Sequence, residues 1–419
     1  MGFFPCIRSC TLSKNHSLKN DNQNKDKDKD KDTDKDLFHS DTKSLSSQPS
    51  LPSVPSLTSH AQPPSSTTSN YHYITTLKNH TSPIFALALT SKHVISASSD
   101  SQIRIWSRDT SSPTSSSLVA CGFTAVKSMV IHGEKILTGH QDNKIRVWKL
   151  NEKQKVLACV ATLPTFSDRL MKIVFAKNYV EIRRHRMCTW VHHVDVVSCL
   201  ALSKDGTMIY SGSWDRTFKV WRTSDYKCLE SVWNAHDDAI NALVVSHDCV
   251  YTGSADRKIK VWRRHNGEKK HKLVDTLEKH KSAVNALALS TDGSILYSGA
   301  CDRSIIVWEK PRGGSDDAQH MVVAGALRGH SKAILCINVV GDVVFSGSAD
   351  KTIRIWKRGI DGKSYLCLGI LEGHKGPIKC LAVALENGTS SSHGGTSYLV
   401  YGGSLDCDIK LWKLWVPFL

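Results

Sequence analysis

The sequence contains no long hydrophobic run. No stretch of its 419 residues approaches the roughly 18 consecutive apolar residues that a membrane-spanning helix needs. Its opening, MGFFPCIRSC, also lacks the extended apolar core of a secretory signal. These two absences predict an intracellular chain without a membrane span.

Cysteines in paired spacing are missing as well. Thirteen cysteines are scattered along the chain without the spacing of a zinc site or a disulfide framework. Cys199, Cys336 and Cys380 lie in apolar runs, as small buried hydrophobic residues do. Since no motif of any reaction class is present either, we expect no enzyme activity, no cofactor and no metal.

The first 70 residues have too few apolar side chains for a folded domain. Residues 25–36 alternate Lys and Asp almost strictly, and residues 44–70 are rich in Ser, Pro and Thr. Neither stretch buries enough apolar surface to offset an ordering cost of about 1–2 kcal/mol per residue. Residues 1–70 are therefore predicted to be a disordered tail, in which phosphorylation and acylation of Cys6 or Cys10 stay open.

Basic residues are in excess outside the tail. The net charge is +16, and the tail contributes only +1, from nine Lys/Arg against eight Asp/Glu. The remaining 46 basic and 31 acidic residues give the rest of the chain +15. Such an excess favours acidic protein surfaces or nucleic acid as partners.

From Tyr71 onward the sequence repeats. Seven tryptophans recur, with an aspartate six residues before each, and Ser or Thr stands four residues before six of these aspartates. A histidine precedes six of the aspartates by 20–32 residues. The marks are Trp106, Trp148, Trp221, Trp262, Trp308, Trp356 and Trp412; Asp100, Asp142, Asp215, Asp256, Asp302, Asp350 and Asp406; Ser96, Thr138, Ser211, Thr252, Ser298 and Ser346; and His80, His193, His236, His280, His330 and His374.

Hydrogen bonding explains the offsets between these marks. Runs such as HVISAS and QIRIW are alternating strands, and the aspartate between them suits a tight turn. A hydrogen-bonded chain of indole, hydroxyl, imidazole and carboxylate would link three strands of one repeat. Because the set recurs once per repeat, we interpret it as structural and not as a metal or acid–base site.

These marks resemble those of the WD40-repeat family, which implies an all-β fold, a seven-bladed WD40 β-propeller over residues 71–419. The run YHYITTL (71–77) precedes the first histidine and is predicted to complete the last blade of a monomeric propeller. Two departures stand out. No repeat ends in Trp-Asp, and Gly122 occupies the histidine position of the second repeat, where we expect an incomplete network.

An insert separates the second and third repeats. Trp148 and Trp221 are 73 residues apart, whereas Trp106 and Trp148 are 42 apart. The extra residues, about 164–191, are predicted to lie between blades 2 and 3 on the face of the Asp turns. If MCTWVHH is a strand instead, the insert lies on the opposite face. The segment LPTF…NYVEIRRHR resembles a plant group of WD40 proteins, the Jingubang group. This resemblance implies a regulatory protein in plant signalling or transcription, located in the nucleus and the cytoplasm.

Partner binding in the WD40 family commonly uses the face of the Asp turns. Carrying over the family's exposed positions predicts a binding set of Phe85, Lys127, Gln141, Trp214, Asn241, Asn285, Leu335, Lys379 and Leu405. Trp214 is the expected anchor, since large aromatic side chains dominate interface centres. The alternative is that Trp214 packs under the insert. A basic cluster of Arg183, Arg184 and Arg186 is a second candidate, for nucleic acid or acidic protein.

These observations predict a non-catalytic protein–protein interaction scaffold or regulatory adaptor. Direct nucleic-acid binding through a basic propeller face is the alternative, and it predicts an affinity that falls steeply with salt. A substrate receptor of a ubiquitin ligase is a further alternative. The absence of Trp-Asp-x-Arg, in which WD40 receptors of this kind resemble one another, argues against it.

Overall fold

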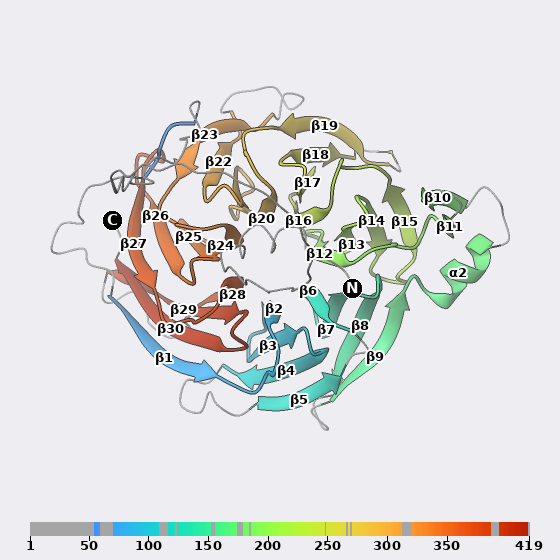
Figure 1. Ribbon diagram of the computed structural model, residues 1–419, viewed down its shortest axis with the longest axis horizontal. Coiled ribbons are helices and arrows are strands. Elements are labelled where there is room, and N and C mark those ends of the chain that lie inside the picture. The colour runs from blue at the N-terminus through green and yellow to red at the C-terminus, as the bar shows by residue number, and fades with distance from the viewer. Residues whose placement is uncertain are drawn as a thin grey trace, which may run out of the picture. The chain divides into compact units, whose positions relative to one another are not determined.

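Seven four-stranded antiparallel sheets are arranged around a common centre (Figure 1). The computed structural model describes residues 54–58 and 70–417, except for 109–115, 122–123, 152–155, 174–178, 184–185, 248, 265–266, 269, 312–319 and 387–393. The predicted seven-bladed β-propeller is confirmed.

The first three blades each use four consecutive strands, paired in chain order from the centre outward. Blade 1 contains β2 (Ile84–Leu89), β3 (His93–Ser98), β4 (Gln102–Ser107) and β5 (Ser116–Cys121). Blade 2 contains β6 (Val126–His132), β7 (Lys135–His140), β8 (Ile145–Asn151) and β9 (Val156–Leu163). Blade 3 contains β12 (Val197–Leu202), β13 (Met208–Ser213), β14 (Phe218–Arg222) and β15 (Cys228–Val232).

Blades 4–6 follow the same order. Blade 4 contains β16 (Ile240–Val245), β17 (Cys249–Ser254), β18 (Ile259–Arg263) and β19 (Lys272–Leu277). Blade 5 contains β20 (Val284–Leu289), β21 (Ile295–Ala300), β22 (Ile305–Glu309) and β23 (Val322–Leu327). Blade 6 contains β24 (Ile334–Val340), β25 (Val343–Ser348), β26 (Ile353–Arg358) and β27 (Tyr365–Leu371). The second strands are buried almost throughout, because neighbouring blades cover both of their faces.

Blade 7 is completed by the two ends of the propeller. It contains β28 (Ile378–Leu385), β29 (Gly395–Ser404), β30 (Ile409–Pro417) and, as its outer strand, β1 (Asn70–Leu77). Tyr73 pairs with Trp412 and Leu77 with Ile409. Leu77 is 2% exposed and packs in the cluster shared by blades 7 and 1. The run at 71–77 therefore closes the ring as the sequence predicted.

The turn between the second and third strands has the same backbone in every blade. A non-glycine residue with φ between 67° and 75° follows the aspartate: Ser101, Asn143, Arg216, Arg257, Arg303, Lys351 and Cys407. Residues other than glycine rarely adopt this left-handed backbone conformation unless local hydrogen bonds stabilise it. In six blades the carboxylate supplies that support by accepting the N–H two residues further on, as Asp256 does from Lys258 at 2.9 Å.

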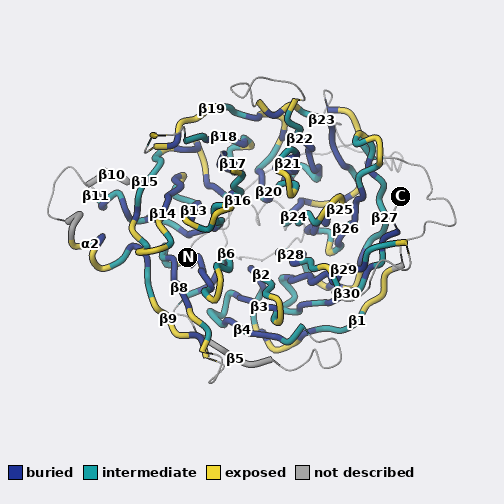
Figure 2. Tube along the Cα trace, turned by 180° about the vertical axis from the view of Figure 1, so that it is seen from behind, coloured by how far each residue is buried: buried dark blue, intermediate teal, exposed yellow. Residues whose placement is uncertain are grey.

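The insert leaves the outer strand β9 of blade 2 and ends before β12, the first strand of blade 3. It contains helix α2 (Phe166–Ile173) and a hairpin of β10 (Tyr179–Arg183) and β11 (Arg186–Thr189), which lie outside the ring (Figures 1 and 2). MCTWVHH is therefore not a strand of a blade. Asp168 of α2 is 3% exposed and accepts the backbone N–H of Cys228 in β15 at 2.9 Å, which fastens the insert to blade 3.

One part of the predicted tail is ordered against the propeller. Val54–Thr58, the short blue segment beside β23 in Figure 1, forms isolated parallel bridges from Ser56 to Ala326 and from Thr58 to Tyr365. The prediction of a tail disordered through residue 70 is wrong for this segment. The amino-acid composition of residues 1–70 as a whole does not reveal that two apolar side chains, Val54 and Leu57, pack against the propeller. Residues 1–53 and 59–69 lie outside the described ranges.

Closure of the ring by β1 predicts a specific stability effect. Replacing the buried Leu77 with Ala should lower the free energy of unfolding by about 2–5 kcal/mol, because it leaves a cavity at the seam. His72→Ala on the same strand is the matched control, since His72 is exposed and its loss should cost no more than about 0.5 kcal/mol. Urea unfolding measures both. Equal effects of the two substitutions would show that β1 is not needed for closure.

Candidate partner-binding face

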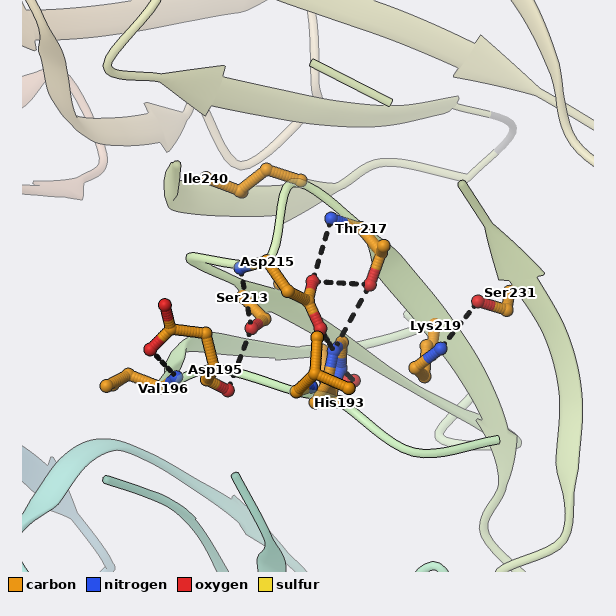
Figure 3. A network of polar contacts seen from close by, with 12 residues as sticks. His193, Asp195, Val196, Ser213, Asp215, Thr217, Lys219, Ser231 and Ile240 are labelled. Atoms are coloured by element: carbon orange, nitrogen blue, oxygen red, sulfur yellow. Dashed lines mark hydrogen bonds and ion pairs between the residues drawn. The ribbon is translucent and has the colours of Figure 1, made fainter. Parts of the chain in front are cut away.

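The Asp turns of all blades define one face of the propeller, here called the Asp-turn face. Beneath it, each of blades 3–6 contains the expected hydrogen-bonded chain. In blade 3 the Nδ1 atom of His193 lies 2.9 Å from Asp215 (Figure 3). Its Nε2 atom lies 2.8 Å from the Ser211 hydroxyl, and the Trp221 indole donates to that hydroxyl at 2.9 Å.

The corresponding distances in blades 4–6 differ little. The His–Asp contacts of His236, His280 and His330 measure 2.8, 2.9 and 2.8 Å. Their contacts with Thr252, Ser298 and Ser346 measure 2.8, 2.8 and 2.9 Å. The indoles of Trp262, Trp308 and Trp356 complete each chain at 2.9, 2.8 and 2.9 Å. Each chain joins the loop before the first strand to the second and third strands.

These contacts hold the aspartates ionised. Burial alone would raise the pKa of Asp256, but the hydrogen bond and charge of His236 and two backbone N–H donors outweigh it and lower the pKa to about 2. Asp302 follows the same balance, and its pKa is also lowered to about 2. In blade 3, Asp215 additionally accepts from Thr217 at 2.6 Å, and its pKa lies far below the usual range. Such groups are fixed acceptors, not proton donors.

Blades 1 and 7 depart from the pattern in one link each. In blade 1 the Nδ1 atom of His80 is 3.9 Å from Asp100, beyond hydrogen-bond distance, and Asp100 instead accepts from Thr81 and Ser98. Burial lowers the pKa of His80 to about 4. The expected His80–Asp100 bond is therefore absent. In blade 7, where Gly402 replaces the hydroxyl residue, His374 bonds the Gly402 carbonyl at 3.1 Å.

Blade 2 corrects the expectation of an incomplete network. Its histidine comes from the end of the second strand: the Nε2 atom of His140 lies 2.7 Å from the Thr138 hydroxyl, which also accepts the Trp148 indole at 2.7 Å. The Nδ1 atom of His140 lies 3.2 Å from the Thr124 carbonyl. Asp142, which has no histidine partner here, forms a two-point ion pair with Arg146.

Polar side chains near the beginning of the first strands form hydrogen bonds to the neighbouring blades. The amide of Asn241 donates to the Val284 carbonyl at 3.0 Å, and the amide of Asn285 donates to the Ile334 carbonyl at 2.9 Å. Ser198 donates in the same way to Ile240. Asn241 and Asn285 belong to the predicted partner-binding set, and the structure gives their amides a role between blades. Their contact with a partner stays a prediction.

Phe85 was assigned to the exposed binding set, but its side chain is buried. It is 8% exposed, and the Lys127 ammonium lies 3.8 Å from the centre of its ring. Burial lowers the pKa of Lys127 to about 8, and the positive charge of Lys379 adds to this effect. Phe85, Lys127 and Lys379 therefore form a basic cluster from blades 1, 2 and 7, with the aromatic ring as its floor.

A cleft of about 950 Å³ crosses blades 2–4 on the Asp-turn face. Trp214 lines it from the turn of blade 3 and Trp233 from the loop that leads to blade 4. The insert supplies Pro164, Arg169 and Cys188 to its wall. The remaining charged lining consists of Asp142, Lys144, His192, His193, Asp195, Asp215, Arg216, Asp237 and Asp238. We refer to this feature as the Trp cleft.

The other predicted residues are spread over the face. Gln141 is exposed, and Leu335, Lys379 and Leu405 are half-buried. Of these, none lines the Trp cleft, whereas half-buried Trp214 does. In the basic insert, Arg183 pairs with Arg186 across the β10–β11 hairpin, and Arg184 lies outside the described ranges. The sequence missed Trp233 because it belongs to no repeated position.

Within the described residues, no group of three or more His, Cys, Asp or Glu side chains is placed to hold a metal ion. The same ranges contain no helix long and apolar enough to cross a membrane. The buried thiols of Cys199 and Cys336 have pKa values raised to about 12 by burial, so they are packed side chains and not nucleophiles.

Seven blades that each carry a buried histidine and a buried tryptophan, with a buried hydroxyl residue in six of them, define a repeat propeller. This chain belongs to the WD40 family: the family model "WD domain, G-beta repeat" matches residues 71–107, 185–222, 227–263, 271–309, 322–357 and 365–413. The matched ranges leave out β6–β9, the blade in which His140 replaces the usual loop histidine. WD40 propellers bind other proteins and are generally non-catalytic.

Similar proteins share parts of this propeller. WD repeat-containing protein pop2 of Schizosaccharomyces pombe is 26% identical over 36% of this chain and 22% of its own length. Transcription factor unc-37 of Caenorhabditis elegans is 28% identical over 23% of this chain and 17% of its own length, and human striatin-4 is 28% identical over 40% and 26%. The chain thus spans about a quarter or less of these relatives. The WD40 propeller of Doa1 has the same fold, with a TM-score of 0.59, 22% identity and coverage of 82% of this chain and 96% of its own.

The substitute histidine of blade 2 predicts a measurable pH dependence. An unfolded histidine titrates near 6.5, whereas burial lowers the pKa of folded His140 to about 4. Between pH 7 and pH 5 the unfolded chain therefore takes up a proton that the folded state does not, and stability falls. His140→Gln should remove on the order of 2 kcal/mol of this loss, measured as unfolding free energies at the two pH values.

The control for this measurement is His72→Gln, which changes an exposed histidine of β1. It should leave the difference between pH 7 and pH 5 as in the wild type. If His140→Gln shows the wild-type difference too, His140 is not the buried neutral partner of Thr138.

Proposed function

We propose that this chain is a non-catalytic interaction scaffold that binds partner proteins at the Trp cleft. The observation that carries the proposal is the pair Trp214 and Trp233 in a cleft of about 950 Å³, to whose wall the insert contributes Pro164, Arg169 and Cys188. Aromatic side chains in a concave site with a charged rim are what an interface centre needs. Trp214 is the proposed anchor.

The state of the histidines and aspartates supports the non-catalytic part of the proposal. In blades 3–6 each imidazole is bonded at both nitrogens, to an aspartate and to a hydroxyl. The pKa values of Asp256 and Asp302 are lowered to about 2, so neither carboxyl is protonated at neutral pH. General acid or base catalysis needs a group that changes its proton near the working pH.

The charges around the cleft suggest what the partner presents. Asp237 and Asp238 are exposed beside Trp233. A partner segment with an apolar or aromatic side chain next to a Lys or Arg would contact both the indoles and these carboxylates. The excess of basic residues over the whole propeller favours acidic partners at other places, such as the cluster of Lys127 and Lys379.

The insert motifs LPTF and NYVEIRRHR support a narrower role, as a regulatory protein of the plant Jingubang group with a nuclear and cytoplasmic location. The similarity to a transcription factor, unc-37, supports a regulatory function. We further propose that the propeller is monomeric, because β1 closes its ring within one chain. A ubiquitin-ligase receptor would be a form of the same scaffold, against which the missing Trp-Asp-x-Arg argues.

Direct nucleic-acid binding is the second candidate. It rests on the basic cluster of Arg183, Arg184 and Arg186 in the sequence. Arg183 and Arg186 pair across the β10–β11 hairpin, which lies outside the ring of blades (Figure 1). Such binding depends on phosphate neutralisation and weakens steeply with salt. Binding through Trp214 would depend on salt far less.

Affinity capture from a native cell extract, after nuclease treatment, tests the two candidates. We expect Trp214→Ala to lose discrete partner proteins, because truncating an aromatic anchor typically costs about 2–4 kcal/mol of binding. Tyr73→Ala is the matched control: Tyr73 is 51% exposed on β1, away from the cleft, and its loss should leave the captured proteins unchanged.

A third variant replaces Arg183, Arg184 and Arg186 with Ser. Capture that depends on nucleic acid and on these arginines would reject the scaffold in favour of nucleic-acid binding. A lower melting temperature of Trp214→Ala with unchanged capture would mean that Trp214 only packs beneath the insert.

A further inference from the structure

The segment Val54–Thr58, here called the strap, lies between the outer strands of blades 5 and 6. The Leu57 N–H donates to the Ala326 carbonyl of β23 at 3.0 Å, and the Ala326 N–H donates to the Pro55 carbonyl at 2.8 Å. On the other side, the Tyr365 N–H of β27 donates to the Leu57 carbonyl at 2.9 Å. The strap therefore adds to the edges of two sheets at once.

Side chains fix the strap in one register. Leu57 packs on the core cluster that joins blades 5 and 6. Val54 is 5% exposed, whereas Pro55 and Ser56 between them are exposed. The strap thus inserts two apolar side chains, three residues apart, and leaves the intervening residues outside.

Arg328 forms hydrogen bonds with both ends of the strap. Its guanidinium donates to the Val54 carbonyl at 3.0 Å, and its backbone N–H donates to the Thr58 hydroxyl at 3.1 Å. The Thr58 hydroxyl in turn faces the Arg328 carbonyl at 3.4 Å. A hydroxyl residue directly after the leucine is therefore part of the recognised pattern.

The strap lies in a groove between β23 and β27, and this groove has a glycine, Gly325, at the place where the Leu57 side chain enters. A Cβ on Gly325 would lie 2.5 Å from Leu57 Cγ, and the three atoms it would meet first all belong to the strap. Gly325 faces Val307 across β22 and β23. The residues at the matching place in the other outer strands are Ser117, Ala161, Glu230, Asp275, Gly369 and Thr75.

Only blades 5 and 6 have glycine at this place, and both glycines receive a side chain from the N-terminal part of the chain. At Gly369 a Cβ would lie 3.0 Å from the ring of Tyr71, which belongs to β1. β1 is the fourth strand of blade 7, so Tyr71 is part of the ring itself. The strap is different, because blades 5 and 6 each have four strands without it.

We propose that the groove between β23 and β27 is a binding site for extended peptides, and that the strap is its ligand in cis. The peptide class is apolar–Pro–small–Leu–Ser/Thr, read from VPSLT. The backbone edges provide affinity and the niche at Gly325 selects leucine, as in other cases of strand addition to a sheet edge. A partner protein with such a segment binds when it displaces the strap. The site is independent of the Trp cleft, which lies on blades 2–4.

The test uses the full chain and a fluorescein-labelled peptide of residues 51–60, LPSVPSLTSH, in an anisotropy titration. Leu57→Asp in the chain removes the anchor of the strap and should leave the groove open. We expect this variant to bind the peptide at least tenfold more tightly than the wild-type chain, in which the tethered strap competes. The same peptide with aspartate in place of its leucine should not bind.

Gly325→Val, added to Leu57→Asp, should abolish binding because the new side chain fills the leucine niche. Ala161→Val is the matched control, since Ala161 holds the same place on β9. Combined with Leu57→Asp, it should leave the affinity for the peptide unchanged.

Three results would overturn the proposal. The first is a folded Leu57→Asp chain that binds the peptide no better than the wild type. The second is a melting temperature of that variant lower by more than about 8 °C, which would make the strap a structural strand. The third is a wild-type dimer that becomes monomeric on Leu57→Asp, which would mean that the strap crosses to a second copy. Loss of partner capture by Trp214→Ala bears on none of these outcomes.

Discussion

The buried imidazole beneath the Asp-turn face holds the strands of its blade together through hydrogen bonds. In blades 3–6 one ring nitrogen bonds an aspartate in the turn after the second strand, and the other bonds a hydroxyl within that strand, as His236 bonds Asp256 and Thr252. The Trp262 indole on the third strand donates to the same hydroxyl. Since both nitrogens are needed, the loop that carries the histidine has little freedom. The Asp turns are consequently held at one face, where the turns of blades 2 and 3 line the Trp cleft.

Blade 2 shows that this constraint concerns the hydrogen bonds and not a sequence position. Thr138 and Trp148 keep their places, but the imidazole arrives from the end of β7 as His140, and not from the loop before the first strand. The aspartate then loses its usual partner and turns to Arg146. The ion pair of Asp142 and Arg146 lies beside the Trp cleft, so the irregular blade and the insert that follows it shape the same part of the surface.

The fold could be predicted almost completely from the sequence, because its marks recur seven times at fixed offsets. The ring closure by residues 71–77 followed from counting strands. Individual sites were harder to predict, because a repeated position has different neighbours in each blade. Phe85 and Trp214 were both assigned to the exposed set, yet Phe85 is 8% exposed beneath Lys127, whereas Trp214 lines a cleft made by the insert. The strap escaped prediction because its groove is built from residues about 270 positions away, such as Arg328.

The outer strand of blade 7 also has a consequence for synthesis of the chain. β1 is synthesised long before its partner β30, because Thr76 and Lys410 are separated by 334 positions. At about 5–20 residues per second, roughly 20–70 seconds pass before the two can meet. During that time six blades can form one after another while β1 remains without its partner. The ring can therefore close only after β30 has been made, and until then the growing propeller is an open arc.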